Sequence, residues 1–184
     1  MEPGLKKYAC KLTLDQNTAH TRVSLSEGNR KAKWGRKDQP YPDHPDRFKH
    51  WQHVLSVESL TGRCYWEAKW RGLGAAVAVS YRGIMRKGGD EDGRFGFNHQ
   101  SWSLEYFNSW YCVYHNGQKI GEFPHRHQSG RVGVYLDWSA GILTFYSVSP
   151  DTHTLTHIHT LHTTFTEPLH AGFWVYRNSS VCVR

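Results

Sequence analysis

The chain has 184 residues and a mass of 21.3 kDa, the size of one domain that buries its own core without disulfides or metals. It contains no apolar run of about 18 residues that could span a membrane as a helix, and no leader typical of a secretory signal opens it. Aromatic residues are 14% of the chain, which excludes disorder, and the net charge is +7. The basic excess lies wholly in residues 1–100, with 18 basic and 11 acidic side chains against 5 of each in the remainder.

Apolar and polar residues alternate in short segments along the first half of the chain. A period of two is typical of half-buried β-strands. It predicts strands at 11–14, 64–70 and 75–81. Asp15–Ala19 and Asp46–Trp51 could each form one helical turn at most.

The second half continues the pattern, with predicted strands at 102–106, 132–136 and 143–147. Asn116-Gly117 stands between two strand-like segments, a strong hairpin signal because both residues tolerate positive φ. Residues 137–141 predict another tight turn. Short strands at this spacing, without a long amphipathic helix, indicate an all-β sandwich or barrel.

Three polar stretches rich in glycine or proline are predicted loops, and long loops in a compact domain are often functional. They are residues 26–50, 82–94 and 124–130.

Several spaced motifs resemble those of the PRY-SPRY family, in the family's order and over nearly the whole chain. Leu14–His20 is close to the opening motif LDPxTAH, with Gln16 in place of proline, and Gly62–Ala68 is close to GRxYWEV. The segment Pro40–Pro45 resembles versions found in fish proteins. Further matching segments are 131–137, 141–147, 165–169 and 172–173.

This resemblance implies a two-sheet antiparallel β-sandwich with a concanavalin-like jelly roll. It implies a single domain over 1–184, with a PRY part at about 8–60 and a SPRY part at about 61–184. It also implies a non-catalytic module without a cofactor, which binds a partner protein through variable loops at one edge of the sandwich. Such modules end TRIM-type ubiquitin ligases, NLR-type immune receptors and stonustoxin-like pore-forming toxins.

From these relatives we expect a cytoplasmic chain that recognises a target in innate immunity. The isolated domain is expected to be monomeric, and upstream segments would make a full-length protein oligomeric. Aromatic and arginine side chains dominate interface energies, although core packing is the alternative for each aromatic. The predicted partner-binding residues are Trp34, Arg36, Arg86, Lys87, Tyr106, Phe107, Trp110, Arg126, Phe173, Trp174 and Tyr176.

Nothing in the sequence predicts an enzyme or a metal site. Glu67 and Asp137 are the acids within well-marked strands, and both suit surface or turn-capping roles. There is no nucleophile-elbow, P-loop or dinucleotide glycine motif. On a strand, His157 and His159 would share a face while His162 would lie on the other, which does not gather three ligands.

The four cysteines, Cys10, Cys64, Cys112 and Cys182, all fall in strand-like segments without a C-x-x-C pair. We interpret them as small buried thiols of a reducing compartment. A metal or disulfide role stays open, because four cysteines allow three pairings.

Two other binding functions stay open. The run Arg30–Lys37 has five bases around Trp34, a composition that suits nucleic acid, an acidic protein or a solvated loop; a protein partner is favoured over nucleic acid. A basic pocket for a small phosphorylated ligand could come from Arg82, Arg86, Lys87, Arg94, His99, Arg126 and His127. The chain could alternatively be the C-terminal module of a pore-forming toxin subunit.

Overall fold

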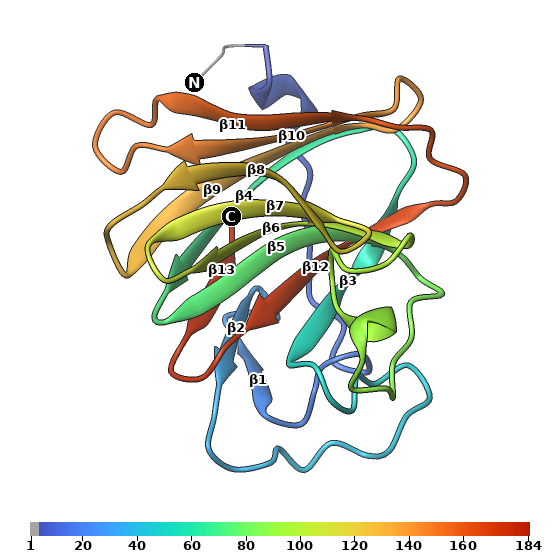
Figure 1. Cartoon of the computed structure of the whole chain (residues 1–184). Coiled ribbons are helices and arrows are strands. Elements are labelled where there is room, and N and C mark those ends of the chain that lie inside the picture. Colours follow the sequence, from blue (N-terminus) through green and yellow to red (C-terminus); the bar gives the residue numbers. More distant parts are fainter. Residues whose placement is uncertain (1–3) are drawn as a thin grey trace.

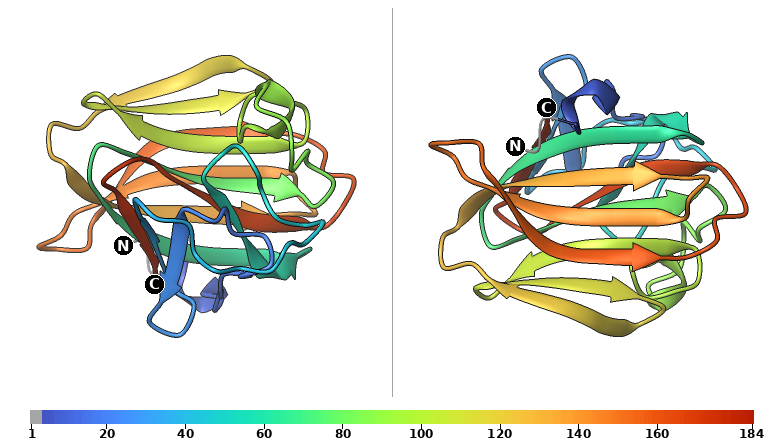
Figure 2. Two further views of the ribbon diagram at one scale, coloured as in Figure 1. Left: turned by 90° about the horizontal axis from the view of Figure 1, so that it is seen from below. Right: turned by 90° about the horizontal axis from the view of Figure 1, so that it is seen from above.

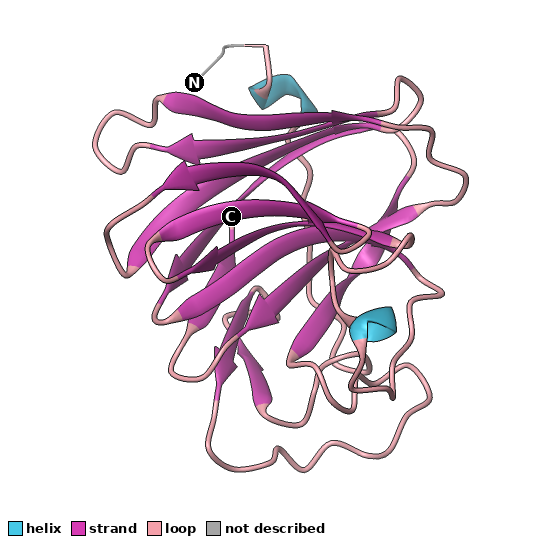
Figure 3. Cartoon of the chain, viewed as in Figure 1, coloured by secondary structure: helices cyan, strands magenta, loops and turns pink. Residues whose placement is uncertain are grey.

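The computed structural model describes residues 4–184 and is built almost entirely of antiparallel strands (Figures 1 and 3). Two antiparallel sheets lie face to face as layers (Figure 2), which confirms the predicted two-sheet sandwich. Within the described residues, helical structure is limited to the 3₁₀ turns η1 (Lys6–Tyr8) and η2 (Glu91–Gly93). No helix in this part of the chain is long and apolar enough to cross a membrane.

The larger sheet has seven strands in the order β1-β2-β13-β4-β9-β10-β11. These strands are β1 (Val23–Ser26), β2 (Lys31–Trp34), β13 (Ser180–Val183), β4 (Arg63–Arg71), β9 (Ser129–Asp137), β10 (Ile142–Val148) and β11 (Leu155–His162).

The smaller sheet has six strands in the order β3-β12-β5-β6-β7-β8. These strands are β3 (His53–Leu60), β12 (Leu169–Val175), β5 (Gly74–Tyr81), β6 (Ser101–Phe107), β7 (Trp110–His115) and β8 (Gln118–Pro124).

The core lies between the two sheets, where the inward-facing side chains of the strands pack. Trp66 and Leu136 come from the larger sheet, and Leu104 and Phe173 from the smaller. All four are at most 2% exposed. Burying a large apolar side chain contributes about 2 kcal/mol to the stability of the fold. The apolar residues that recur with a period of two therefore supply the contacts that hold the two sheets together.

The Asn116-Gly117 hairpin forms as predicted and joins β7 to β8. Asn116 and Gly117 have φ values of 51° and 78°, and a two-residue turn with positive φ at both positions matches the twist of the flanking strands.

One strand prediction and one loop prediction differ from the structure. Leu12 and Leu14 are buried as their alternation suggested, but 11–14 makes only an isolated bridge from Leu14 to Ser56. Conversely, the predicted loop 26–50 contains β2. In β2, Ala32 is the single buried residue, and it stands between Lys31 and Lys33. A strand with one apolar residue between two lysines gives no recognisable alternation in the sequence.

The cysteine prediction is wrong for two of the four residues. Cys10 and Cys64 form a disulfide with a Cα–Cα separation of 5.6 Å, within the usual range for such bonds. A parallel bridge between Ala9 and Tyr65 brings the two sulfurs together. Cys112 and Cys182 are free and only half-buried.

Candidate functional site

A groove of about 330 Å³ opens where four connections meet at one end of the sandwich. The connections are the β4–β5 turn, the β6–β7 turn, the β8–β9 loop and the β12–β13 loop, on the left in Figure 1. The groove is lined by Leu73, Tyr106, Phe107, Asn108, Ser109, Arg126, Gln128, Tyr176 and Arg177.

Packed aromatic rings support the groove from below. Trp70 stacks on Tyr106 with ring centroids 4.0 Å apart, and Tyr111 meets Trp70 edge-on at 6.0 Å. The indole nitrogen of Trp70 donates a 2.8 Å hydrogen bond to the hydroxyl of Tyr111, and burial raises the pKa of that hydroxyl. His125 packs against all three rings. This support is therefore fixed by ring contacts and a satisfied polar pair.

Exposed aromatic side chains form the rim of the groove. Phe107 is 49% exposed and Trp110 is 43% exposed, and they face each other as a cross-strand pair. The ring of Tyr176 meets Phe107 edge-on at 5.7 Å, and Trp174 lies 5.2 Å from Tyr176. Large apolar side chains left this open to water are typical of contact sites for a partner.

The tight β6–β7 turn explains why these rings project. Asn108 and Ser109 have φ values of 52° and 71°, so the chain reverses in two residues and holds Phe107 and Trp110 side by side.

Hydrogen bonds between loops fix the shape of the groove. The amide of Gly72 donates to the carbonyl of Gln128 at 2.8 Å, and the amide of Gly74 donates to Ser179 Oγ at 3.1 Å. The amide of His125 donates to the carbonyl of Ser109 at 2.9 Å. All four connections are thereby linked, which lowers the entropy that would be lost when a partner binds.

The charge of the groove is positive. Arg126 and Arg177 line it and are exposed, and its lining contains no acidic side chain. Asn108, Ser109 and Gln128 add neutral hydrogen-bonding groups. The site thus combines apolar area with cationic and neutral polar groups, and it lacks the acid, base and nucleophile arrangement of a catalytic centre.

The structure brings most of the predicted aromatic site residues to this groove. Tyr106, Phe107, Arg126 and Tyr176 line it. Trp174 stands beside Tyr176 on the outer side of β12. Phe173 differs, because it is 0% exposed and points into the core; alternation along β12 puts neighbouring side chains on opposite faces.

Trp34 lies next to the β12–β13 loop, and Arg36 follows it by two residues. The amide of Trp34 donates to the carbonyl of Ser179 at 3.1 Å. Trp34 is half-buried against the core and Arg36 is exposed. Both residues therefore border the same end of the molecule as the groove without lining it.

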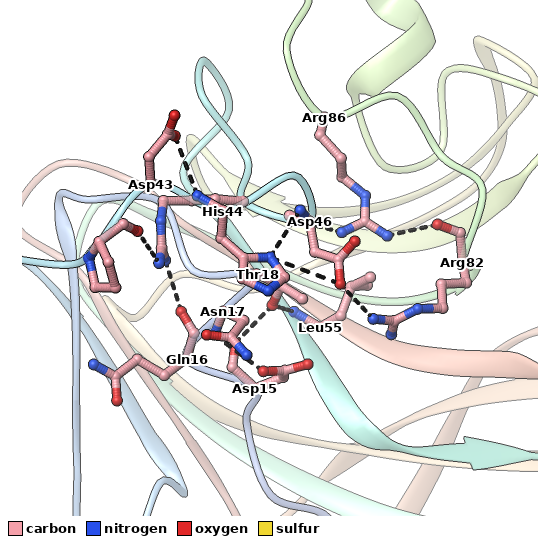
Figure 4. A network of polar contacts seen from close by, with 12 residues as sticks. Asp15, Gln16, Asn17, Thr18, Asp43, His44, Asp46, Leu55, Arg82 and Arg86 are labelled. Carbon is pink, nitrogen blue, oxygen red and sulfur yellow. Dashed lines mark hydrogen bonds and ion pairs between the residues drawn. The ribbon is translucent and has the colours of Figure 1, made fainter.

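Arg86 and Lys87 lie in the loop after β5, at the opposite end of that strand from Gly74 (right in Figure 1). The guanidinium of Arg86 donates to the carbonyls of Ile84, Asp46 and Arg82. Figure 4 shows it within a polar network that links this loop to the segment around Asp46. Arg86 thus holds two loops together.

The residues considered for a phosphorylated ligand do not all lie in one place, although Arg82 and Arg86 are neighbours. Arg82 is paired with Asp46 and Arg94 with Glu105, and the nitrogens of Arg86 are bonded to carbonyls. Arg126 lies at the other end of the sandwich in the groove. The charges of Arg82 and Arg94 are therefore compensated by carboxylates, and Arg126 belongs to a different end of the molecule.

The acids considered for catalysis have structural partners. Glu67 accepts a 2.7 Å hydrogen bond from the Tyr65 hydroxyl and pairs with Arg131 at 3.4 Å. Asp137 accepts from Arg63 and caps the turn at Ala140. Among residues 4–184, no three His, Cys, Asp or Glu side chains are placed to hold a metal ion.

The predicted site residues did not include Leu73 and Arg177, although the family resemblance implied variable loops at 71–74 and 173–179. Leu73 is 38% exposed between Gly72 and Gly74, and a lone apolar residue between glycines is a usable signal for an exposed turn. Arg177 follows the aromatic run of β12, and no local pattern distinguishes it from an ordinary surface arginine.

Comparison with protein families gives two adjoining matches. The family model described as "SPRY-associated domain" matches residues 12–60, and that described as "SPRY domain" matches residues 63–184.

Similar chains include both toxin subunits and tripartite-motif proteins. Stonustoxin subunit beta of Synanceia horrida is 42% identical over 172 residues, which cover 93% of this chain and 24% of the toxin subunit. Tripartite motif-containing protein 16 of Mus musculus is 37% identical over 183 residues, which cover 95% of this chain and 31% of the mouse protein. The chain therefore spans about a quarter to a third of the length of these relatives.

Solved structures show the same arrangement. A stonustoxin structure superposes with a TM-score of 0.86 at 40% identity, covering 98% of this chain and 28% of that chain. The TRIM65 PSpry domain superposes with a TM-score of 0.87 at 27% identity, covering 98% of this chain and 93% of that chain.

Proposed function

This chain belongs to the PRY-SPRY family, a family of protein-interaction modules, and we propose that it binds a partner protein in the groove bordered by Phe107 and Trp110. The observation that carries the proposal is the exposure of these two aromatic side chains, 49% and 43%, beside a groove with fixed walls. Exposed aromatics over a rigid support offer much contact area at little entropic cost.

The chemistry of the lining supports an extended segment or loop of a protein as the bound element. Apolar side chains of the partner would pack on Phe107 and Tyr176, whose rings already meet edge-on. Arg126 and Arg177 would orient polar or acidic groups, since their guanidinium groups are exposed at the groove. In this proposal the module is non-catalytic, and residues 1–184 act as one domain.

The nature of the longer protein is a separate proposal. We infer a target-recognition role in innate immunity for a TRIM-like or NLR-like protein. The 42% identity to stonustoxin subunit beta supports the alternative of a toxin subunit. The Cys10–Cys64 disulfide weighs against a cytoplasmic location, because disulfides persist in oxidising compartments. Sequencing the full-length transcript that encodes residues 1–184 would distinguish these alternatives.

Site-specific photocrosslinking tests the groove. A benzophenone side chain placed at Phe107 or Trp110 should crosslink a protein from extracts of the source tissue. Val57 and Met85 are the matched controls, because they are apolar and 56% and 52% exposed but lie outside the groove. A partner crosslinked equally from all four positions would contradict the proposal.

Binding by the purified partner completes the test. Replacing Phe107, Trp110 and Tyr176 by alanine should weaken its affinity by 100-fold or more, given about 1–2 kcal/mol or more for each such anchor. The variant Val57→Ala with Met85→Ala should bind like wild type. Unchanged affinity of the groove variant, with its fold intact by circular dichroism, would place the interface elsewhere.

A further inference from the structure

The outer face of the seven-stranded sheet carries a cluster of basic side chains. In the sequence these residues are spread over 101 positions, from Lys31 to Arg131. In β4, Lys69 and Arg71 point outward because Trp70 between them is buried in the core. In β2, Lys31 and Lys33 point outward on either side of buried Ala32.

The strand register places these residues in two cross-strand rows. One row runs Lys33, Ser180, Arg71, Ser129, and the other runs Lys31, Cys182, Lys69, Arg131. Successive outward side chains are about 7 Å apart along a strand, and adjacent strands are about 5 Å apart. We call the five cations Lys31, Lys33, Lys69, Arg71 and Arg131 the basic face.

Most of these charges are not neutralised. Within residues 4–184, Arg131 is the member of the basic face that forms an ion pair, with Glu67 at 3.4 Å. Lys31, Lys33, Lys69 and Arg71 have no ion-pair partner in the described chain, whereas Arg22, Lys49, Arg63, Arg82, Arg94 and Lys119 all do. Four unpaired cations on one sheet face repel one another and create a local positive potential.

The N-terminal segment covers the neighbouring half of the same sheet face and leaves the basic half open. Leu5 packs on Tyr65 and Tyr146, and Tyr8 packs against Tyr135. The side chains of Lys33, Lys69 and Arg71 are exposed, and those of Lys31 and Arg131 are half-exposed. The basic face is therefore accessible.

We propose that the basic face binds the surface of a lipid bilayer that contains anionic headgroups. This inference is independent of the protein partner proposed for the groove. Lysine and arginine side chains near an anionic bilayer each contribute roughly a fivefold increase in partitioning.

The composition of the two rows favours a bilayer over other polyanions. Every outward side chain in the rows is basic, a serine or a cysteine. The carboxylate of Glu27, just after β1, accepts a 3.5 Å hydrogen bond from the thiol of Cys182 in the second row. The centre of a protein interface is instead depleted of lysine and enriched in aromatics. Single-stranded nucleic acid is held by aromatic stacking, and sequence readout of a duplex needs a helix or ribbon that enters the groove. An open sheet face whose five cations outnumber the adjoining carboxylates of Glu27 and Glu67 suits a broad anionic surface.

Sedimentation with vesicles tests the proposal. The 184-residue chain should co-sediment with phosphatidylcholine vesicles containing about 30% phosphatidylserine, should not do so with pure phosphatidylcholine, and should dissociate as salt rises from about 50 to about 500 mM. Replacing Lys31, Lys33, Lys69 and Arg71 by glutamine should weaken partitioning by on the order of a hundredfold or more.

A second fourfold variant separates the face from net charge. Replacing Lys7, Lys11, Lys87 and Lys119 by glutamine removes the same charge from exposed positions outside the rows, and should keep vesicle binding within a few-fold of wild type. Both variants must unfold cooperatively on heating. Equal weakening in the two variants, or absence of vesicle binding by wild type, would overturn the proposal. So would retention on duplex DNA or on a polyglutamate column that exceeds vesicle binding and depends on the basic face.

Discussion

Lys69 on β4 and Arg131 on β9 are direct cross-strand neighbours, so two positive side chains face each other on the outer side of the larger sheet. Like charges in directly opposite positions destabilise a sheet. Arg131 is compensated by Glu67 at 3.4 Å, and Lys69 has no such partner among the described residues. The repulsion between Lys69 and Arg131 therefore destabilises this part of the sheet.

Lys69→Glu should therefore stabilise the protein. It replaces a repulsion by an attraction toward Arg131, and we expect the free energy of unfolding in urea to rise by about 0.5 kcal/mol. Lys33→Glu is the control, because it changes net charge equally but stands opposite Ser180 and Ser24. If both variants shift stability alike, net charge and not the Lys69–Arg131 pair is responsible.

Gly72→Ala should destabilise the protein strongly. Gly72 has a φ of +114°, and a Cβ there would lie 2.3 Å from the carbonyl oxygen of Asn178. Backbone strain of this kind costs about 1–3 kcal/mol, and urea unfolding measures it. Gly62→Ala is the control, because no atom lies within 4 Å of its Cβ position. Equal small losses in both variants would show that the β4–β5 turn is not held against the β12–β13 loop.

Reduction should destabilise the wild-type chain. The Cys10–Cys64 disulfide has a sequence separation of 54 residues, and closing a loop of that size is worth about 2–4 kcal/mol. Dithiothreitol should lower the urea midpoint of wild type and leave that of Cys10→Ala unchanged. Two alkylated thiols from this pair in the untreated protein, found by mass spectrometry, would contradict the disulfide.

Mild acid should destabilise the protein through His53. Burial, with a smaller contribution from Arg94, holds the pKa of His53 well below its usual value. As pH falls, His53 of the unfolded chain therefore binds a proton before His53 of the folded chain does. The contribution of neutral His53 to the free energy of unfolding is complete above about pH 6.5 and is lost as pH falls below that value.

His53→Phe isolates this effect. The ring of His53 stacks on Phe95 at 3.8 Å, and its Nδ1 has no hydrogen-bond partner, so phenylalanine keeps the stacking and removes the proton site. Between pH 7.5 and pH 5.5, wild type should lose about 1 kcal/mol more unfolding free energy than the variant. Parallel pH profiles for the two proteins would exclude His53 as the cause.

Local sequence patterns predicted much of the fold because they report which face of a strand meets the core. Val77 and Val79 alternate in β5 as the period of two required, and Asn116-Gly117 set the β7–β8 hairpin. The same logic failed at β2, where Ala32 is the single buried residue between lysines. Residue type and the family resemblance pointed to Phe107 and Trp110. Phe173 was assigned to the core only once the structure showed which face of β12 meets the core.

The sequence by itself determined the all-β class, the family and the positive charge of the first hundred residues. It could not determine which charges meet, because strand pairing joins positions far apart in the chain. Lys33 and Arg71 share a row through Ser180, and Lys69 faces Arg131. Likewise, the groove exists because Gly72, Gln128 and Ser179 bond across separate loops. Only the tertiary structure decides such contacts, since each loop or strand alone has no preference for the partner it finds.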